Sequence, residues 1–541
     1  MNKYVSFSLR SRKLALAAAT LVGAGVSACN VTDLQPQNAL PEASVYTDAN
    51  RVALAVTGVY NAAQSGFYDP LNGGALAVRG YPFGAAANEL DDARGEDVVD
   101  MAGFFGIVYR NQLTTASPNV VNIWSNCYAL INQANVTIAG VQQATAAGVI
   151  TAADAAIYLG ELRFLRALAH HELVLHFSRP YTENNGTSPG VPYRETAINT
   201  QDAIATARAV DRGTVANVYT KMLADLDFAE QNLPATRTGN ARVTRATKGA
   251  AIALKQRLYL YQGNWSKTVD EGNKIISTAT PFTSSVGGYA LMPTPQEAFP
   301  GGANVTVENV FSVENSADDN PSVNGALATV FGSRQPIASG GIGARGLIAI
   351  SPILYNASFW TCNDLRRTQL TQADAPRYAL RKYRDATNNT DFAPIIRYAE
   401  VILNQAEAEA RQGNSARGLL LLNAVRNRAV AAADQYTTLS GTNLIQAVLN
   451  ERRIELVGEG FRWDDIHRLS PTSFSPRTGG GIPAKYLSTQ IALAQYSCGA
   501  GTLLTPSVPA IPYTNQLFLW PIPAIEIANN ATLAAQQNPG Y

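Results

Sequence analysis

Charged side chains are scarce in this chain of 541 residues, and their two signs nearly cancel. They make up 15% of the residues, against the roughly 25% usual for soluble domains. The 42 Lys and Arg residues and the 41 Asp and Glu residues give a net charge of +1, which disfavours an electrostatic nucleic-acid interface. Four cysteines are too few for a disulfide-built scaffold. With 46% apolar residues, the composition excludes a disordered or collagen-like chain.

Long hydrophobic runs are also missing. No segment after the N-terminal leader holds 18 or more consecutive apolar residues. The run Leu14–Val26 has 13 residues, too few to span a hydrocarbon core, which needs about 20 in a helix. It follows a basic leader that contains no acidic residue, as in a secretory signal. We therefore predict that residues 1–28 are a signal peptide.

The leader ends on small residues directly before Cys29. This resembles a bacterial lipobox, in which the cysteine is acylated (palmitate among the chains) and becomes the first residue of the mature protein. An ordinary signal peptide with a chance cysteine is the alternative. Several acyl chains anchor stably, so we predict a lipid-anchored tether over residues 29–49. Only Asp33 follows Cys29 closely, so an acidic surface-export signal is weak and an inward-facing orientation stays open.

The three remaining cysteines, Cys127, Cys362 and Cys498, cannot all pair internally. None of them forms the CxxC spacing of a zinc site, and no metal or cofactor is expected. Cys127 lies in a helical pattern and is predicted to be a small core residue. Whether Cys362 pairs with Cys498 is left open by the sequence.

Apolar periodicity predicts a mainly helical protein. In Thr151–Phe177 two apolar stripes indicate a helix packed between neighbours. Loop-rich inserts separate the helices at 66–118, 178–210, 280–390 and 471–520. The predicted long helices are Asn50–Gln64, Val120–Val141, Thr151–Phe177, Thr214–Leu233, Lys248–Gln262, Ser266–Ser277, Ile395–Gln412, Ser415–Ala433 and Leu444–Gly458.

Three catalytic motifs match in sequence, but the structural context that each motif needs is missing. His171 and His176 are five residues apart, about 140° out of register on a helix, so they cannot ligate zinc together as in a zincin. They are predicted to be packing or helix-surface residues, like His170. Gly186–Gly190 matches G-x-S-x-G and Gly341–Gly346 matches G-x-G-x-x-G. Both lack the strand before and the helix after that the chemistry needs, so both are predicted to be loops.

Adjacent acids occur at Asp91-Asp92, Asp318-Asp319 and Asp464-Asp465. A glycosidase needs two carboxyls across a cleft, roughly 5 to 9.5 Å apart, which sequence adjacency does not establish. The expectation is a solvated loop for these pairs, or ion pairs with Arg462 and Arg468 for the last one.

Four segments and the C-terminus carry a family resemblance. They are Gly160–Leu168 with Leu173–Phe177, Arg245–Ala251 with Leu258–Trp265, Pro394–Val401 with Asn404–Ala408 and Leu422–Arg428, Glu451–Leu456 with Glu459–Trp463, and Pro521–Pro523 with Gln537–Tyr541. In this order, behind a lipobox, they resemble the SusD/RagB family of outer-membrane nutrient-uptake lipoproteins. The resemblance covers the chain from Cys29 to Tyr541.

The resemblance implies a mostly α fold of tetratricopeptide-like helix pairs with long loop-rich inserts. Although about 150 residues per domain would give three or four domains, it implies one helical body over residues 50–541. It further implies a protein on the outer face of the outer membrane. There it would bind a glycan or peptide, act as a lid on a TonB-dependent (SusC-like) β-barrel transporter, and have no catalytic activity. A surface-anchored glycoside hydrolase or peptidase is the alternative, and an anchored structural module is a third reading.

Within the motifs, charged residues such as Glu451 and Glu455 are predicted to form ion pairs, and so are Arg397 and Glu400. Trp463 is predicted to anchor the core. The ligand site is expected on the inserts, because aromatic side chains stack on the apolar faces of sugar rings while polar groups orient the hydroxyls. Phe104 and Phe105 stand where a tryptophan platform would be expected, so the ligand stays open between glycan and peptide. The candidate ligand residues are Tyr81, Phe83, Asn88, Arg94, Phe104 and Phe105 in the first insert and Phe331, Arg334, Tyr355 and Trp360 in the third.

Overall fold

A computed structural model describes residues 41–66, 68–69, 74–75 and 80–541. The predicted signal peptide, Cys29 and most of the tether lie outside the described residues. In the described part, no helix combines the length and the apolar character needed to cross a membrane.

Long helices form the body, as the apolar periodicity predicts. Threonine or aspartate side chains begin several of them: Asp48, Thr151 and Thr214 each accept a hydrogen bond from a backbone N–H in the first turn. The helices of the body are α3 (Ala49–Ser65), α6 (Pro118–Ala146), α7 (Ala152–Phe177), α9 (Val215–Asn232), α11 (Lys248–Tyr261), α12 (Trp265–Ile275), α16 (Tyr398–Arg411), α17 (Ser415–Arg426), α18 (Gly441–Leu456) and α19 (Phe461–Leu469).

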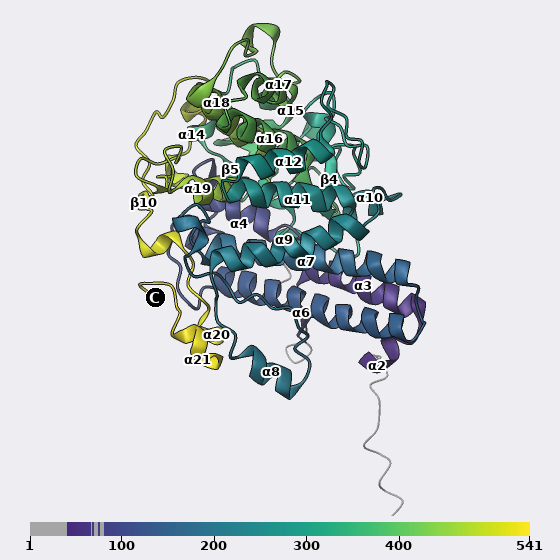
Figure 1. The fold of residues 1–541 in the computed structure, drawn as a ribbon. Coiled ribbons are helices and arrows are strands. Elements are labelled where there is room, and N and C mark those ends of the chain that lie inside the picture. The colour runs from purple at the N-terminus through teal and green to yellow at the C-terminus, as the bar shows by residue number, and fades with distance from the viewer. Residues whose placement is uncertain (1–40, 67, 70–73, 76–79) are drawn as a thin grey trace, which may run out of the picture.

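These helices stack in an order that follows the chain (Figure 1). Helix α7 packs between α6 and α9, α9 packs on α11, and α11 contacts both α12 and α16. Helices α11 with α12 and α16 with α17 are the two expected pairs, and α18 packs on α16. Helix α7 is buried almost throughout its second half, which agrees with its two apolar stripes. The mostly α fold of helix pairs with long inserts is therefore confirmed.

The helix predicted as Val120–Val141 is longer in the structure, since α6 ends at Ala146. Two other predicted helix limits are wrong for tertiary reasons. Residues 395–397 belong to strand β8 (Ala393–Arg397) rather than to the following helix. Strand β8 pairs antiparallel with β4 (Asn309–Val313), and this pairing decides the conformation of β-branched residues that also fit a helical pattern. Helix α17 ends at Arg426 instead of continuing to Ala433. The chain turns there, and the carbonyl of Ala429 accepts a hydrogen bond from the N–H of Leu365.

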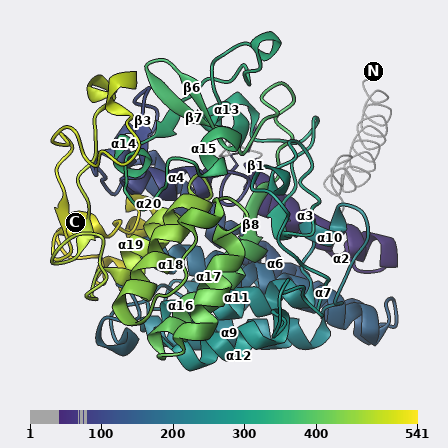
Figure 2. The same cartoon turned by 90° about the horizontal axis from the view of Figure 1, so that it is seen from above.

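Much of the first and third inserts forms a second layer along one side of the helical stack, as Figure 2 shows for α13, α14, α15, β3, β6 and β7. The short helices of the inserts are α4 (Ala86–Arg94), α5 (Gly106–Tyr109), α8 (Gln201–Ala207), α13 (Leu327–Phe331), α14 (Pro352–Tyr355) and α15 (Leu365–Gln369). Outside the inserts, α10 (Ala241–Thr244) lies between α9 and α11, α2 (Glu42–Val45) precedes the body, and α20 (Ala524–Asn529) and α21 (Ala531–Ala534) follow it. The strands pair in twos, all antiparallel: β1 (Tyr68–Asp69) with β2 (Gly74–Ala75), β3 (Val98–Asp100) with β5 (Ile348–Ile350), β6 (Thr371–Asp374) with β7 (Arg377–Leu380), and β9 (Gly481–Ile482) with β10 (Ile511–Pro512).

The three cysteines within the described residues are Cys127, Cys362 and Cys498. Cys362 and Cys498 form a disulfide across 136 residues of sequence, which joins the third insert to the 471–520 insert. Cys127 is a free thiol buried in α6, so its prediction as a core residue is confirmed. A disulfide of this kind is typical of exported proteins.

Candidate functional site

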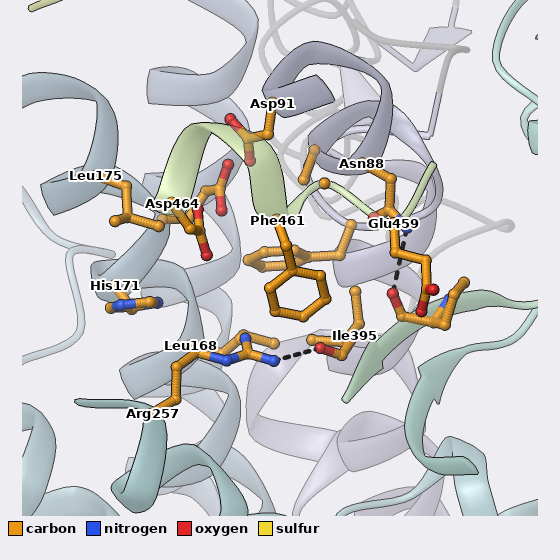
Figure 3. A pocket seen from close by; sticks show the side chains of 15 residues that line it. Asn88, Asp91, Leu168, His171, Leu175, Arg257, Ile395, Glu459, Phe461 and Asp464 are labelled. Atoms are coloured by element: carbon orange, nitrogen blue, oxygen red, sulfur yellow. Dashed lines mark hydrogen bonds between the residues drawn. The ribbon is translucent and has the colours of Figure 1, made fainter. Parts of the chain in front are cut away.

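A small polar cavity lies where the first insert meets the helical body. It measures about 40 Å³, and α4, α7, α11, β8 and α19 each contribute to its wall. Figure 3 shows the carboxyl groups of Asp91 and Asp464 on one side of it and Phe461 with Ile395 on the other. A space of this size with polar walls is large enough for water.

Three acids gather at this cavity. Asp91, Glu172 and Asp464 are all buried, and burial raises the pKa of Glu172 and of Asp464 to about 7. Burial also raises the pKa of Asp91 well above its ordinary value. The neighbouring carboxyls oppose the ionisation of one another, so the group titrates as a unit. The expectation of a solvated loop for Asp91-Asp92 is wrong, because both residues are buried in α4.

Asp91, Glu172 and His176 also lie close enough together to hold a metal ion. The hydrogen bonds of His176 argue against that use. Arg94 Nη1 lies 3.1 Å from Nδ1 of His176, and because a guanidinium only donates, Nδ1 must be the acceptor. The ring proton of a neutral His176 then sits on Nε2, which lies 2.9 Å from Glu172 Oε1. A metal on Nε2 would have to displace that proton, so we assign this cluster as a hydrogen-bonded network.

The predicted residues of the first insert mostly join α4 to the body. Tyr81, Phe83 and Phe105 are buried, and buried Asn88 donates to the carbonyl of Pro394. The remaining two differ from each other. Arg94 is fully buried with its guanidinium 3.1 Å above the Trp463 ring, whereas Phe104 is half-buried and lies 5.5 Å from the guanidinium of Arg345. Of this set, Phe104 is the side chain that keeps substantial exposed surface.

The predicted residues of the third insert divide in the same way. Phe331 and Trp360 are buried, and Arg367 stacks 4.4 Å from the Trp360 ring centre. Arg334 is exposed, but it is held in place by Asp374 and by the carbonyl of Ala375. Tyr355 is half-buried. Among the predicted residues, Tyr355 has a ring contact with Trp360, and their ring centres are 5.8 Å apart.

Tyr355 belongs to a surface cluster of three half-buried tyrosines, which we call the tyrosine cluster: Tyr355, Tyr378 and Tyr496. Ring centres are 4.6 Å apart for Tyr355 and Tyr378, 5.3 Å for Tyr355 and Tyr496, and 5.1 Å for Tyr378 and Tyr496. The rings come from α14, from β7 and from the 471–520 insert, so three distant segments build one patch. Tyr378 and Tyr496 were missed by sequence reasoning; a pairing of Cys362 with Cys498 was the one signal that could have found Tyr496.

The charged residues of the motifs form buried ion pairs, as predicted. Glu455 lies between Arg366, Arg397 and Arg428, at 3.0, 3.0 and 2.6 Å. Although burial disfavours its charge, the three guanidinium groups outweigh burial and lower the pKa of Glu455. Trp463 is fully buried, so its prediction as a core anchor is confirmed. His170, His171 and His176 are buried as well, so their reading as packing residues is confirmed and a place on the helix surface is wrong.

The other motif predictions are settled by the same structure. Gly186–Gly190 and Gly341–Gly346 both lie in loops. Asp465 pairs with Arg468 at 2.8 Å, as expected. Arg462, in contrast, pairs with Glu96 and Asp97 rather than with its own neighbours.

Wider grooves open elsewhere on the surface. One, of about 490 Å³, runs beside Tyr128 and Arg194 between α6, α8 and α20. Another, of about 430 Å³, lies between α3 and α10 beside Tyr60. A third, of about 440 Å³, lies between α17 and the start of α18 beside Leu439. None of these three contains any of the predicted ligand residues.

Comparison with known proteins defines the class. The family described as the SusD family matches residues 371–541, and one described as "Starch-binding associating with outer membrane" matches residues 92–260. With the helix-pair fold already established, the chain belongs to the SusD/RagB family.

Individual relatives are more distant. SusD-like protein P2 of Formosa agariphila is 26% identical over 480 residues, which cover 80% of this chain and 83% of the relative. A SusD superfamily structure from Bacteroides fragilis has a TM-score of 0.71 at 24% identity, covering 90% of this chain and 99% of its own. A structure described as a laminarin-binding SusD-like protein has a TM-score of 0.63 at 19% identity, covering 92% and 100%. At these identities the structures establish the fold alone.

Proposed function

We propose that the protein is a lipid-anchored lid on the outer face of the outer membrane that captures an oligosaccharide and delivers it to a TonB-dependent β-barrel transporter. Family membership supports this role, since one matching family is described by starch binding and outer-membrane association. The laminarin-binding relative supports a carbohydrate as the ligand class. The body over residues 50–541 would then act as one unit.

The tyrosine cluster is the observation that carries the ligand proposal. Three rings share one surface patch, and the C–H faces of a pyranose fit such apolar ring surfaces. The two arginines beside the patch already have partners: Arg367, 4.5 Å from the Tyr355 ring, donates to the carbonyls of Thr361, Tyr355 and Trp360, and Arg377 pairs with Asp374. A neutral oligosaccharide therefore suits the patch better than a charged ligand. Phe104 stays in the proposed site as a second contact from the first insert.

A binding role is better supported than a hydrolytic one. Glycosidases and many peptidases need an acid or base that reaches the substrate. The described acids with strongly raised pKa, such as Glu172 and Asp464, lie inside the protein and not beside the tyrosine cluster. We therefore propose a protein without catalytic activity. Release of reducing sugars or peptides from polymers by the purified protein would instead support the hydrolase or peptidase alternative.

Glycan binding is tested by affinity electrophoresis in gels containing laminarin, starch, xylan or mannan, and by a peptide array. We expect Tyr355→Ala and Tyr378→Ala to weaken binding about tenfold each, because stacked aromatic residues dominate such contacts. Tyr158→Ala is the matched control: Tyr158 is half-buried on α7, outside the inserts. Equal losses in all three variants would contradict the placement of the site, and capture on the peptide array alone would replace the glycan by a peptide.

Anchoring and partnership have separate tests. Cys29→Ala should move the protein from the membrane fraction to the soluble fraction, and unchanged retention would contradict lipidation. Proteinase treatment of intact cells should degrade the wild-type protein if it faces outward. Extraction in mild detergent should co-purify a TonB-dependent barrel, identified by mass spectrometry, and repeated absence of such a barrel would contradict the lid role.

A further inference from the structure

The segment 493–501 is part of the 471–520 insert and carries Tyr496, the third ring of the tyrosine cluster. It contains one short 3-10 turn (Leu493–Gln495), and most of its side chains are exposed. Few apolar contacts therefore hold it, and segments of this kind open easily unless they are tied to the body. The place of Tyr496 depends on the ties that the segment makes.

Those ties converge on residues 356–362. Asn356 is fully buried, and its Nδ2 donates to the Gln495 carbonyl at 2.7 Å while its Oδ1 accepts from the Ser497 N–H at 2.8 Å. One side-chain amide thus holds the backbone on both sides of Tyr496. The carbonyl of Asn356 also accepts from the Gly501 N–H at 3.0 Å.

The disulfide adds a covalent tie at the same place. Cys498 follows Tyr496 by two residues, and Cys362 follows Trp360 by two, so the bond links the segment to the chain that carries Tyr355 and Trp360. Cys362 is exposed and Cys498 is half-exposed, which leaves the bond open to a reductant. The Tyr496 hydroxyl donates to the Ile350 carbonyl at 2.9 Å, and this fixes the direction of the ring.

We propose that Tyr496 forms the third wall of the oligosaccharide site, and that Asn356 with the Cys362–Cys498 disulfide is the clamp that positions it. The clamp makes affinity depend on the disulfide, because an ordered ring loses less conformational freedom when the ligand binds. Asn356, Cys362 and Cys498 are positioning residues, whereas Tyr496 contacts the ligand. This inference rests on the proposed glycan binding, which it extends by assigning a specificity-determining segment.

The clamp itself is tested without a ligand. Hydrogen–deuterium exchange of the full chain, with and without a phosphine reductant, should show faster exchange in peptides covering 493–501 and unchanged exchange in α7. The double variant Cys362→Ser with Cys498→Ser should show the same pattern without reductant. Exchange at 493–501 that does not respond to either treatment would overturn the clamp.

The wall is tested by binding to the four polysaccharide gels named above. We expect Tyr496→Ala to weaken binding about tenfold, and reduction to weaken it about threefold or more. Tyr496→Phe should keep most of the affinity, because it retains the ring. Leu493→Ala, an exposed position in the same segment, is the control and should bind as the wild type does.

The outcomes separate the two proposals. If the wild type binds a polysaccharide and Tyr496→Ala binds it equally well, the wall is wrong and the proposed function stands. If the wild type binds none of the four and captures only peptides, both the glycan proposal and this inference fail. Loss of binding in Tyr496→Phe equal to that in Tyr496→Ala would mean that the hydroxyl holds the fold locally, and would overturn a stacking role.

Discussion

Asp464 and Asp465 are neighbours on α19, both are buried, and their environments are opposite. Asp465 lies 3.0 Å from Arg452 of α18 and 2.8 Å from Arg468, which follows it on α19 itself. These cations outweigh burial and lower the pKa of Asp465. Asp464 lies at the cavity lined by α7 and α4, where burial raises its pKa to about 7, with smaller contributions from the acids Glu172 and Asp465. Burial is common to both acids, so the cations beside each of them decide whether it stays charged.

The Asp465 side belongs to a larger network that holds the helix pairs together. Arg468 also pairs with Glu407 at 2.7 Å, and Arg452 donates to Asn404 at 2.5 Å. The Asp464 side has one hydrogen-bond donor of its own, the Tyr261 hydroxyl at 2.6 Å, and an acceptor oxygen without a partner at the cavity. On one side of α19 ion pairs therefore keep Asp465 charged, and on the other side the charge of Asp464 depends on pH.

The largest effect should come from breaking the charged side. Asp465→Asn removes the carboxylate that pairs with Arg452 and one of the two carboxylates that pair with Arg468. Buried positive charge is then left without full compensation. We expect the free energy of unfolding at pH 7 to fall by about 3 kcal/mol, measured by urea denaturation followed by circular dichroism. A loss no greater than that of Asp464→Asn would contradict the contrast between the two positions.

Asp464→Asn should raise the free energy of unfolding rather than lower it, and the size of the change should depend on pH. A raised folded-state pKa means that the native protein binds protons more tightly than the unfolded chain, so stability is lost as pH rises from about 4 through 7. Asparagine cannot ionise, and its oxygen can still accept from Tyr261. We expect the variant to match the wild type within about 1 kcal/mol at pH 5 and to exceed it by about 1–3 kcal/mol at pH 8.5. Parallel pH profiles of the two proteins would disprove the raised pKa.

The surface rings should matter little for stability, in contrast to both sides of α19. Tyr378→Ala removes a half-buried ring that contacts two other tyrosines. We expect a loss of about 1 kcal/mol in the free energy of unfolding, independent of pH between 5 and 8.5. A loss as large as that of Asp465→Asn would show that the tyrosine cluster is part of the core.

The smallest expected effect is in the protonation of the His176 ring. Burial lowers the pKa of His176 well below its ordinary value, so this ring should stay neutral from pH 5 to 8, with its proton on Nε2. Nitrogen-15 chemical shifts of the histidine side chains check this directly. A proton on Nδ1 would contradict the assigned hydrogen bonds, and a chemical-shift change on adding zinc would show that the Asp91–Glu172–His176 group binds a metal.

The long helices could be predicted from the sequence, because apolar spacing and threonine caps are local signals. Thr151–Phe177 differs from α7 by one residue at its start. That Glu455 forms ion pairs was predictable, but its partners Arg366, Arg397 and Arg428 come from other segments and not from its own motif. The ligand site was not predictable. Arg94 bonds to the carbonyl of Phe518, 424 positions away, and no local pattern separates such a core arginine from a surface one.

Short-range patterns and motif order along the chain were enough to predict the helical body and the family, which the fold and the comparisons confirm. The export leader that they also predict lies outside the described residues. Tertiary structure alone decided which aromatic residues reach the surface, that Cys362 meets Cys498, and which of two adjacent acids keeps its charge. The physical reason is the same in each case. Burial, pairing and pKa depend on groups that approach through space from distant segments, and the order of residues along the chain does not fix those approaches.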